Sequence, residues 1–165
     1  MTANHSPFTL RPYRPEDAAA LLRLFKDTIR RVNSRDYAPD QVAAWSSDEI
    51  DANAWASRFE GRFAVVAEMA GVIAGFVDLF PDGYLDRLFV SADHQGQGIA
   101  TALMDSVLAE AKRLNLPKIE VQVSLTASPF FERQGFRVVE SRTVEVRGTM
   151  LDCFGMEREL PSPAS

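Results

Sequence analysis

The chain has 165 residues, of which 46% are hydrophobic and 25% charged, and its formal net charge is −5. These values are typical of one soluble globular domain, and no apolar run is long enough to cross a membrane. The acidic balance argues against nucleic acid as the main partner, and the single cysteine, Cys153, excludes an intrachain disulfide and favours a cytoplasmic location.

The first half of the chain predicts a strand, several helices and a hairpin. The start of the sequence lacks the basic and apolar segments of a secretory signal, so no leader is expected. A strand is predicted at residues 8–14 and shorter helices at 34–61, with two strands at 63–70 and 72–80 joined through Ala70-Gly71. Between the first strand and the shorter helices, apolar residues recur at helical spacing. They are Ala18, Leu21, Leu22, Phe25, Ile29 and Val32.

The second half alternates between strands and helices. Residues 83–90 predict a strand, and a long helix follows with a stripe made of Ala100, Leu103, Met104, Val107, Leu108, Ala111 and Leu114. Residues 118–125 alternate between apolar and polar, as in a strand with one buried face. A short helix is expected at 128–133, ended by Gly135, and two final strands at 137–146 and 150–159 turn at Arg147-Gly148. This order predicts an α+β (mixed α/β) fold built on one sheet.

The most informative segment is Gln95-Gly96-Gln97-Gly98-Ile99-Ala100, between the strand at 83–90 and the long helix. A helix start directs free N–H groups and a positive dipole end towards the turn, where a phosphate binds well. Glycine at 96 and 98 lets the backbone approach such an anion. The dinucleotide fingerprint is excluded because position 101 is Thr, and no P-loop Gly-Lys-Ser/Thr occurs.

The segment resembles the Q/R-x-x-G-x-G/A loop of the GNAT superfamily of acyl-CoA-dependent N-acyltransferases, with Gln95, Gly98 and Ala100 at the defining positions. The order of the predicted elements is similar to the GNAT order over nearly the whole chain. The resemblance implies one mostly antiparallel central sheet flanked by helices, in a single domain at 1–160 followed by a flexible tail at 161–165.

A second resemblance covers residues 124–136, where GNAT enzymes commonly have N-x-x-A-x-x-F-Y-x-x-x-G-F. Ala127, Phe130, Gly135 and Phe136 match, and Ser124 stands in place of Asn. Phe131 departs from the pattern, because many family members have a tyrosine there that protonates the departing thiolate. Residues 30–45 and the Phe-Phe pair are similar to the YafP-like bacterial subgroup.

The resemblance implies a coenzyme site made largely of main chain. Amides of the glycine turn would hold the pyrophosphate, and backbone groups of the strand before it would bind the pantetheine. The residues expected to contact acetyl-CoA are Leu88, Phe89, Val90, Gln95, Gly96, Gln97, Gly98, Ile99, Ala100, Thr101, Ser128 and Phe131.

The catalytic and acceptor residues are less strongly indicated. Asp86 is the first candidate for the general base and Glu120 the second, and Tyr84 or Ser128 could act as the acid. Alternation predicts that Tyr84 and Asp86 share a face with Leu88 and Val90; an ion pair with an arginine is the competing interpretation of Asp86. Tyr37 and Trp45, with Trp55, could form an aromatic acceptor site, and Asp78 could bind a cationic acceptor. Core packing is the competing interpretation of the aromatic residues, and solvent exposure is that of Asp78.

The function implied is transfer of an acetyl group from acetyl-CoA to a primary amine of a small molecule, by direct attack in a ternary complex. The alternatives are a protein or peptide N-acetyltransferase and a non-catalytic acyl-CoA-binding sensor. His5 and His94 are far apart and lack neighbouring ligands, so no metal is expected. The expected assembly is a monomer or a homodimer, with no membrane partner.

Overall fold

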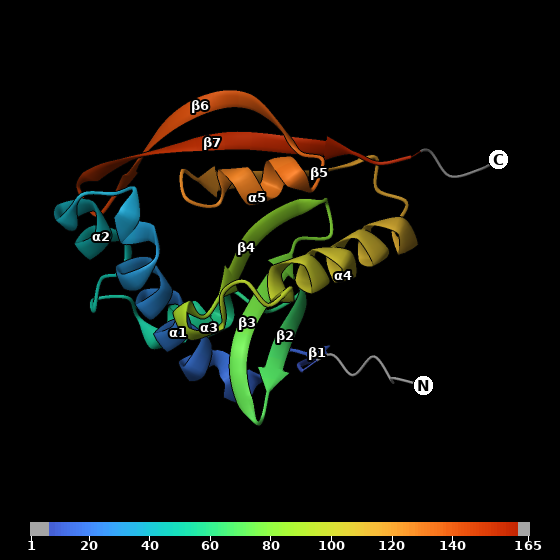
Figure 1. Ribbon diagram of the computed structural model, residues 1–165, viewed down its shortest axis with the longest axis horizontal. Coiled ribbons are helices and arrows are strands. Elements are labelled where there is room, and N and C mark those ends of the chain that lie inside the picture. Colours follow the sequence, from blue (N-terminus) through green and yellow to red (C-terminus); the bar gives the residue numbers. More distant parts are fainter. Residues whose placement is uncertain (1–6, 162–165) are drawn as a thin grey trace.

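The computed structural model describes residues 7–161, and these form a seven-stranded sheet in the order β1-β2-β3-β4-β5-β7-β6 (Figure 1). The strands are β1 (Thr9–Pro12), β2 (Phe63–Met69), β3 (Val72–Leu79), β4 (Tyr84–Val90), β5 (Lys118–Ser124), β6 (Arg137–Val146) and β7 (Thr149–Glu159). Neighbouring strands are antiparallel except β4 and β5, which are parallel. The mixed α/β fold with a mostly antiparallel sheet is therefore confirmed.

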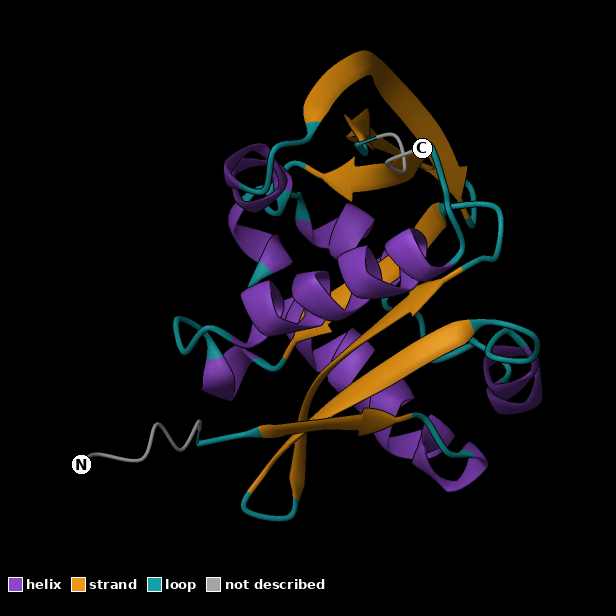
Figure 2. Ribbon diagram, turned by 90° about the vertical axis from the view of Figure 1, so that its right-hand side faces the viewer, coloured by secondary structure: helices purple, strands orange, loops and turns teal. Residues whose placement is uncertain are grey.

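Helices flank the sheet on both faces (Figure 2). They are α1 (Ala18–Arg31), α2 (Pro39–Trp45), α3 (Ala52–Ser57), α4 (Ile99–Arg113) and α5 (Ser128–Arg133). The predicted order of elements is confirmed, although β1 is shorter than the strand expected at 8–14. Within residues 7–161, no helix is both long and apolar enough to cross a membrane. Apart from Pro161, the predicted C-terminal tail lies outside the described residues.

Two hydrophobic cores hold the layers together. The first lies between α4 and the sheet, where Leu103, Met104 and Val107 are fully buried. The second lies between α1, α3 and the opposite face of β2 and β3, with Ile29 and Trp55 at its centre. Each buried aliphatic side chain stabilises the fold by about 1.5–3 kcal/mol. The two cores fix β4 between α4 and α1.

Gly75 of β3 explains how α4 comes so close to the sheet. A Cβ built on this glycine would lie 2.9 Å from the carbonyl oxygen of Phe89 and 3.2 Å from a methyl carbon of Ile99. These separations leave no room for any side chain at position 75. The first turn of α4 is thereby fixed against the end of β4.

A β-bulge interrupts β4 at Asp86. Arg87 pairs with Asp78 of β3, but Leu85 pairs with Leu79, so Asp86 is the extra residue. Leu88 and Val90 consequently pack against the α4 core, whereas Asp86 meets an arginine that follows α3. The prediction that Tyr84 and Asp86 share a face with Leu88 and Val90 is therefore wrong, because simple alternation does not continue through a bulge.

The β6–β7 hairpin arches over the molecule and is attached to α2 and to the segment before it (Figure 1). Arg147 at its tip donates from Nη1 to the carbonyl oxygen of Ala44 at 2.8 Å, and Gln41 donates to that of Met150 at 2.9 Å. The turn at Arg147-Gly148 is confirmed, with φ of 47° and 80° at its two residues. Such a pair of positive φ values suits a two-residue hairpin turn.

Candidate active site

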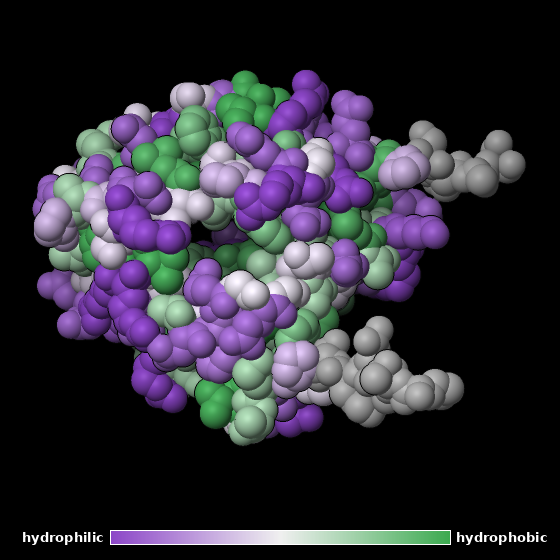
Figure 3. Space-filling view, in the orientation of Figure 1, coloured by the Kyte–Doolittle hydropathy of each residue, from purple (hydrophilic) through white to green (hydrophobic). Residues whose placement is uncertain are grey.

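A cleft opens where β4 and β5 separate. The two strands pair only at Tyr84 with Glu120 and Leu85 with Val121 and then diverge. The cleft has a volume of about 590 Å³ and is lined by residues of both strands, together with residues of all five helices and of the hairpin tip. Figure 3 shows a hollow near the middle of this face of the molecule, bordered by hydrophilic side chains.

The loop before α4 presents unpaired amides next to this cleft. The backbone N–H groups from Gly96 to Thr101 have no acceptor among the described residues. The next N–H group, that of Ala102, donates to the carbonyl oxygen of Gly98. Gly96 and Gly98 have φ of 73° and 83°, in the left-handed region that glycine tolerates, and a Cβ at either would point into open space. Consecutive free amides at the start of a 15-residue helix suit an anion.

Side chains fix the loop in place. Gln95 donates from Nε2 to the carbonyl oxygen of Val90 at 2.7 Å, which ties the loop to the last residue of β4. Asp93 accepts a bond from Arg31 at the end of α1 at 2.7 Å. Ile99 is 1% exposed and belongs to the core beneath α4, so its side chain anchors the first turn of the helix and is not available to a ligand.

The short helix α5 forms another part of the cleft wall. Phe131 is 3% exposed and lies edge-on to Phe136, with ring centroids 5.2 Å apart, yet it also lines the cleft. Ser124, before the helix, accepts bonds from the side chain of Asn33 at 3.3 Å and from the amide of Ala127 at 3.1 Å. Ser128 is buried and does not line the cleft.

Asp86 lines the cleft and is held there by arginines. Its Oδ2 accepts from Arg58 at 3.0 Å and from Arg62 at 2.6 Å. Its Oδ1 accepts no bond from any described residue and is not a buried atom. The ion pair that competed with the catalytic interpretation is thus present, but it engages one oxygen and leaves the other without a partner among the described residues.

Asp78 lies behind this ion pair. It is 0% exposed, accepts from Arg87 at Nε (3.1 Å) and at Nη2, and accepts from Arg62 at 2.9 Å. Burial lowers the pKa of Arg87, although its bonds to Asp78 oppose that shift, and its guanidinium carbon lies 4.5 Å from the Trp55 ring centroid. Asp78 does not line the cleft, and its position indicates that it orients two arginines.

Tyr84 and Glu120 pair across the neighbouring strands β4 and β5 but lie in different surroundings. Tyr84 lines the cleft, and burial raises the pKa of its hydroxyl, so the group is neutral at physiological pH. The Glu120 side chain is 54% exposed, pairs with Lys118 at 3.0 Å and does not line the cleft. Of the two candidate bases, Asp86 is therefore the one beside the cleft.

Of the three aromatic candidates for the acceptor pocket, two line the cleft and one does not. Trp45 lines the cleft and packs edge-on against Phe89, with centroids 6.4 Å apart. Trp55 is 2% exposed, lines the cleft with one edge and donates to the carbonyl oxygen of Ala18 at 3.0 Å. Tyr37 does not line it; its hydroxyl bridges Asp152 and Leu125, and burial raises its pKa.

The arginines of the cleft were not anticipated from the sequence. Its charged lining residues are Arg35, Arg58, Asp86, Arg87, Arg133 and Arg147. Arg58 follows a helix, Arg147 sits in a turn and Arg87 is on a strand, so no spacing in the sequence links them. In the part of the chain that the structure describes, no group of three or more His, Cys, Asp or Glu is placed to hold a metal ion.

The comparisons with known proteins identify the family of the chain and its fold. A model of the acetyltransferase (GNAT) domain matches residues 33–160. The N-acetyltransferase YafP of Escherichia coli (strain K12) is 32% identical over 147 residues, which cover 89% of this chain and 93% of that protein.

Solved structures extend the likeness to three dimensions. A GCN5-related N-acetyltransferase from Rhodopseudomonas palustris superposes with a TM-score of 0.89 at 32% identity, covering 97% of this chain and 99% of the other. YncA from Salmonella typhimurium, solved with its cofactor acetyl-CoA, superposes with a TM-score of 0.71 at 20% identity, covering 96% and 97%. The latter likeness concerns the fold alone.

Proposed function

The chain belongs to the GNAT family of N-acetyltransferases, and we propose that it transfers the acetyl group of acetyl-CoA to a primary amine of a small molecule. Both substrates would occupy the cleft together, and the amine would attack directly. The observation that carries the proposal is the separation of β4 from β5 in a cleft beside the free amides of residues 96–101. We place the reaction in the cytoplasm, with the protein a monomer or a homodimer.

The described residues fit the coenzyme in three respects. Unpaired amides at the start of α4 suit a pyrophosphate, and Leu88, Phe89 and Val90 line the cleft in the part of β4 that β5 no longer pairs with. Ala100 and Phe131 line the same cleft, whose length of exposed strand edge suits an extended pantetheine. When bound, acetyl-CoA supplies a thioester that is open to attack by an amine.

Asp86 and Tyr84 are the residues we assign to proton transfer. An amine is protonated at neutral pH and must lose a proton before it attacks, usually to a carboxylate or to water held by one. Asp86 lines the cleft, and its Oδ1 accepts no bond from any described residue, while Oδ2 is held by Arg58 and Arg62. Tyr84 is neutral and beside the cleft, so it can donate a hydrogen bond to the acceptor or to the departing group.

The alternatives differ in what they require of the cleft. A protein or peptide acceptor needs a groove open along its length, but the β6–β7 hairpin is bonded to α2 at Ala44 and to Gln41, which closes one side. This favours a small acceptor. A non-catalytic sensor would bind acyl-CoA without turnover, an alternative that the absence of a hydroxyl at Phe131 keeps open.

The first experiment is a thermal-shift titration with acetyl-CoA, with CoA and NAD as comparators. Saturation at a hundred times Kd should stabilise the protein by about 2.7 kcal/mol, which is about 5–10 °C for a chain of this size. A rise with acetyl-CoA that NAD does not produce would support the coenzyme site. No rise at millimolar acetyl-CoA would contradict the proposal.

The assignment of proton transfer to Asp86 is then tested by measuring turnover of a panel of amines, with the release of the CoA thiol as the readout. We expect Asp86→Asn to lower kcat about 100-fold while acetyl-CoA affinity is retained, a typical loss for a general base. Glu120→Gln is the matched comparison, because it makes the same chemical change on the neighbouring strand outside the cleft. A loss confined to Glu120→Gln would show that Asp86 is not the base.

A further inference from the structure

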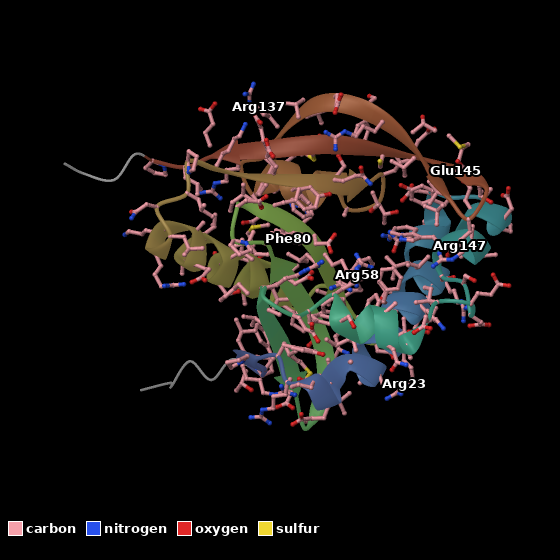
Figure 4. The ribbon with its side chains drawn as sticks, turned by 180° about the vertical axis from the view of Figure 1, so that it is seen from behind. Arg23, Arg58, Phe80, Arg137, Glu145 and Arg147 are labelled. Atoms are coloured by element: carbon pink, nitrogen blue, oxygen red, sulfur yellow. The ribbon has the colours of Figure 1, made fainter. Side chains whose placement is uncertain are left out.

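The two ends of the cleft lie on opposite faces of the molecule. The loop before α4 is on the face seen in Figure 1, and α3 is on the face seen in Figure 4. If the first end takes the coenzyme, the amine enters from the second. The inference below concerns this second end and rests on the proposed function.

Two arginines border the opening on the α3 side. Arg58 directly follows α3, and Arg147 is at the tip of the β6–β7 hairpin. Figure 4 shows them on opposite sides of one opening, although 89 positions separate them in the sequence. Both line the cleft, as do the apolar side chains of Trp45, Ile50 and Val146.

The charge of Arg147 is not neutralised by the protein. It donates from Nη1 to the carbonyl oxygen of Ala44, a bond that fixes the side chain without compensating its charge. No carboxylate of residues 7–161 forms an ion pair with it, including Glu145 two positions earlier on β6. Its Nε and Nη2 donate to no described acceptor and are free to bind a ligand.

Arg58 belongs to a network that also carries excess positive charge. Its members are Arg58, Arg62, Arg87, Asp78 and Asp86, three cations with two anions. Arg58 uses only Nη2 within it, for its bond to Asp86, and its side chain is 45% exposed. Together with Arg147, this network has two more positive than negative charges, in a chain whose net charge is −5.

This arrangement is poorly suited to a simple cationic amine, which two partly exposed guanidinium groups would repel. It suits a molecule that carries an amine and a carboxylate, because arginine binds carboxylates through paired hydrogen bonds. The ammonium group would meet the open Oδ1 of Asp86, and the carboxylate would meet Arg147 and Arg58. We propose that the acceptor is an amino-acid-like zwitterion with an apolar or aromatic side chain that packs against Trp45 and Ile50.

The test compares amino acids with the amines formed by removing their carboxylate. The pairs are L-phenylalanine with phenethylamine, L-leucine with 3-methylbutylamine, and L-tryptophan with tryptamine. For at least one pair, we expect kcat/KM to be about 10- to 100-fold higher for the amino acid, the range of a charge-assisted hydrogen bond. Equal efficiencies in every pair would overturn the inference while leaving the proposed transfer intact.

Arg147→Gln should remove this preference by raising KM for the amino acid, with KM for acetyl-CoA unchanged. Arg23→Gln is the matched control, since it removes one charge from an exposed arginine of α1 that does not line the cleft (Figure 4). A parallel loss for the amino acid and its amine would overturn the assignment of Arg147.

Binding provides a second readout that does not depend on turnover. Calorimetry with the CoA-bound protein should detect the amino acid of the preferred pair, with affinity weakened about tenfold or more in Arg147→Gln. No binding of any amino acid to protein that does bind CoA would overturn the inference alone. Absence of CoA binding would instead contradict the proposed function.

Discussion

The two ends of the cleft are built in different ways. Towards α4, the groups available to a ligand are main-chain amides from Gly96 to Thr101 and the unpaired edge of β4. Towards α3, they are side chains, chiefly Asp86, Arg58 and Arg147, which come from a strand, a helix end and a turn. A main-chain site depends on backbone geometry, whereas a side-chain site depends on the partners that orient each charge. The two ends should therefore respond to different substitutions.

At the α3 end, substitutions in the ion-pair network should have their largest effect on the free energy of unfolding. Asp78→Asn leaves Arg87, which is 4% exposed, with only the more distant carboxylate of Asp86 at 3.7 Å, and breaking a buried pair destabilises a protein by about 3–5 kcal/mol. Urea unfolding measures the change. Asp48→Asn is the control, because that side chain is 82% exposed in its pairs with Lys26 and Arg30, and it should change stability by about 1 kcal/mol or less. Equal losses in both would show that the buried network contributes no more to stability than an exposed ion pair.

At the α4 end, substitutions in the glycine turn should have their largest effect on the affinity for acetyl-CoA. Gly98→Val forces a β-branched residue to φ of 83°, which displaces the amides around it, and acetyl-CoA affinity should fall about 100-fold or more, or about 2.7 kcal/mol. The matched control is Gly71→Val, at φ of 79° and also in open space, but in the β2–β3 turn. Both variants should lose similar stability, and only the first should lose coenzyme affinity in the thermal-shift titration. Unchanged affinity in Gly98→Val would place the coenzyme elsewhere.

The same difference explains how much could be predicted from the sequence. The strand, glycine turn and helix that position the amides are local, so Gln95, Gly98 and the stripe from Leu103 to Ala111 were enough to predict their arrangement. The individual strands and their hairpin turns followed from alternation and turn residues, whereas the mostly antiparallel sheet was implied by the resemblance to the GNAT superfamily. Local patterns of this kind persist in the fold because each element buries one face.

The α3 end could not be predicted in this way. The direction of Asp86 is set by a bulge, which arises from the register shift between β3 and β4. No residue type in β4 indicates that a bulge occurs there. Arg58 and Arg147 approach the cleft only because the hairpin tip is bonded to Ala44 and because α3 packs on α1. Such proximity results from tertiary packing between segments far apart in the sequence, which a single sequence does not reveal.

Phe131 lies between the two ends and gives the smallest expected effect. Phe131→Tyr adds a hydroxyl at the position where related enzymes have their acid. We expect stability to change by about 1 kcal/mol or less, since the ring already borders the cleft and its new O–H can reach water there. Turnover should change less than about threefold, because a thiol with a pKa of about 8.5 departs readily as thiolate. Phe130→Tyr, one position earlier and also lining the cleft, is the control for adding a hydroxyl. A tenfold rise in kcat with Phe131→Tyr alone would show instead that proton delivery to the departing group limits the reaction, and that the side chains of the α3 end do not supply it.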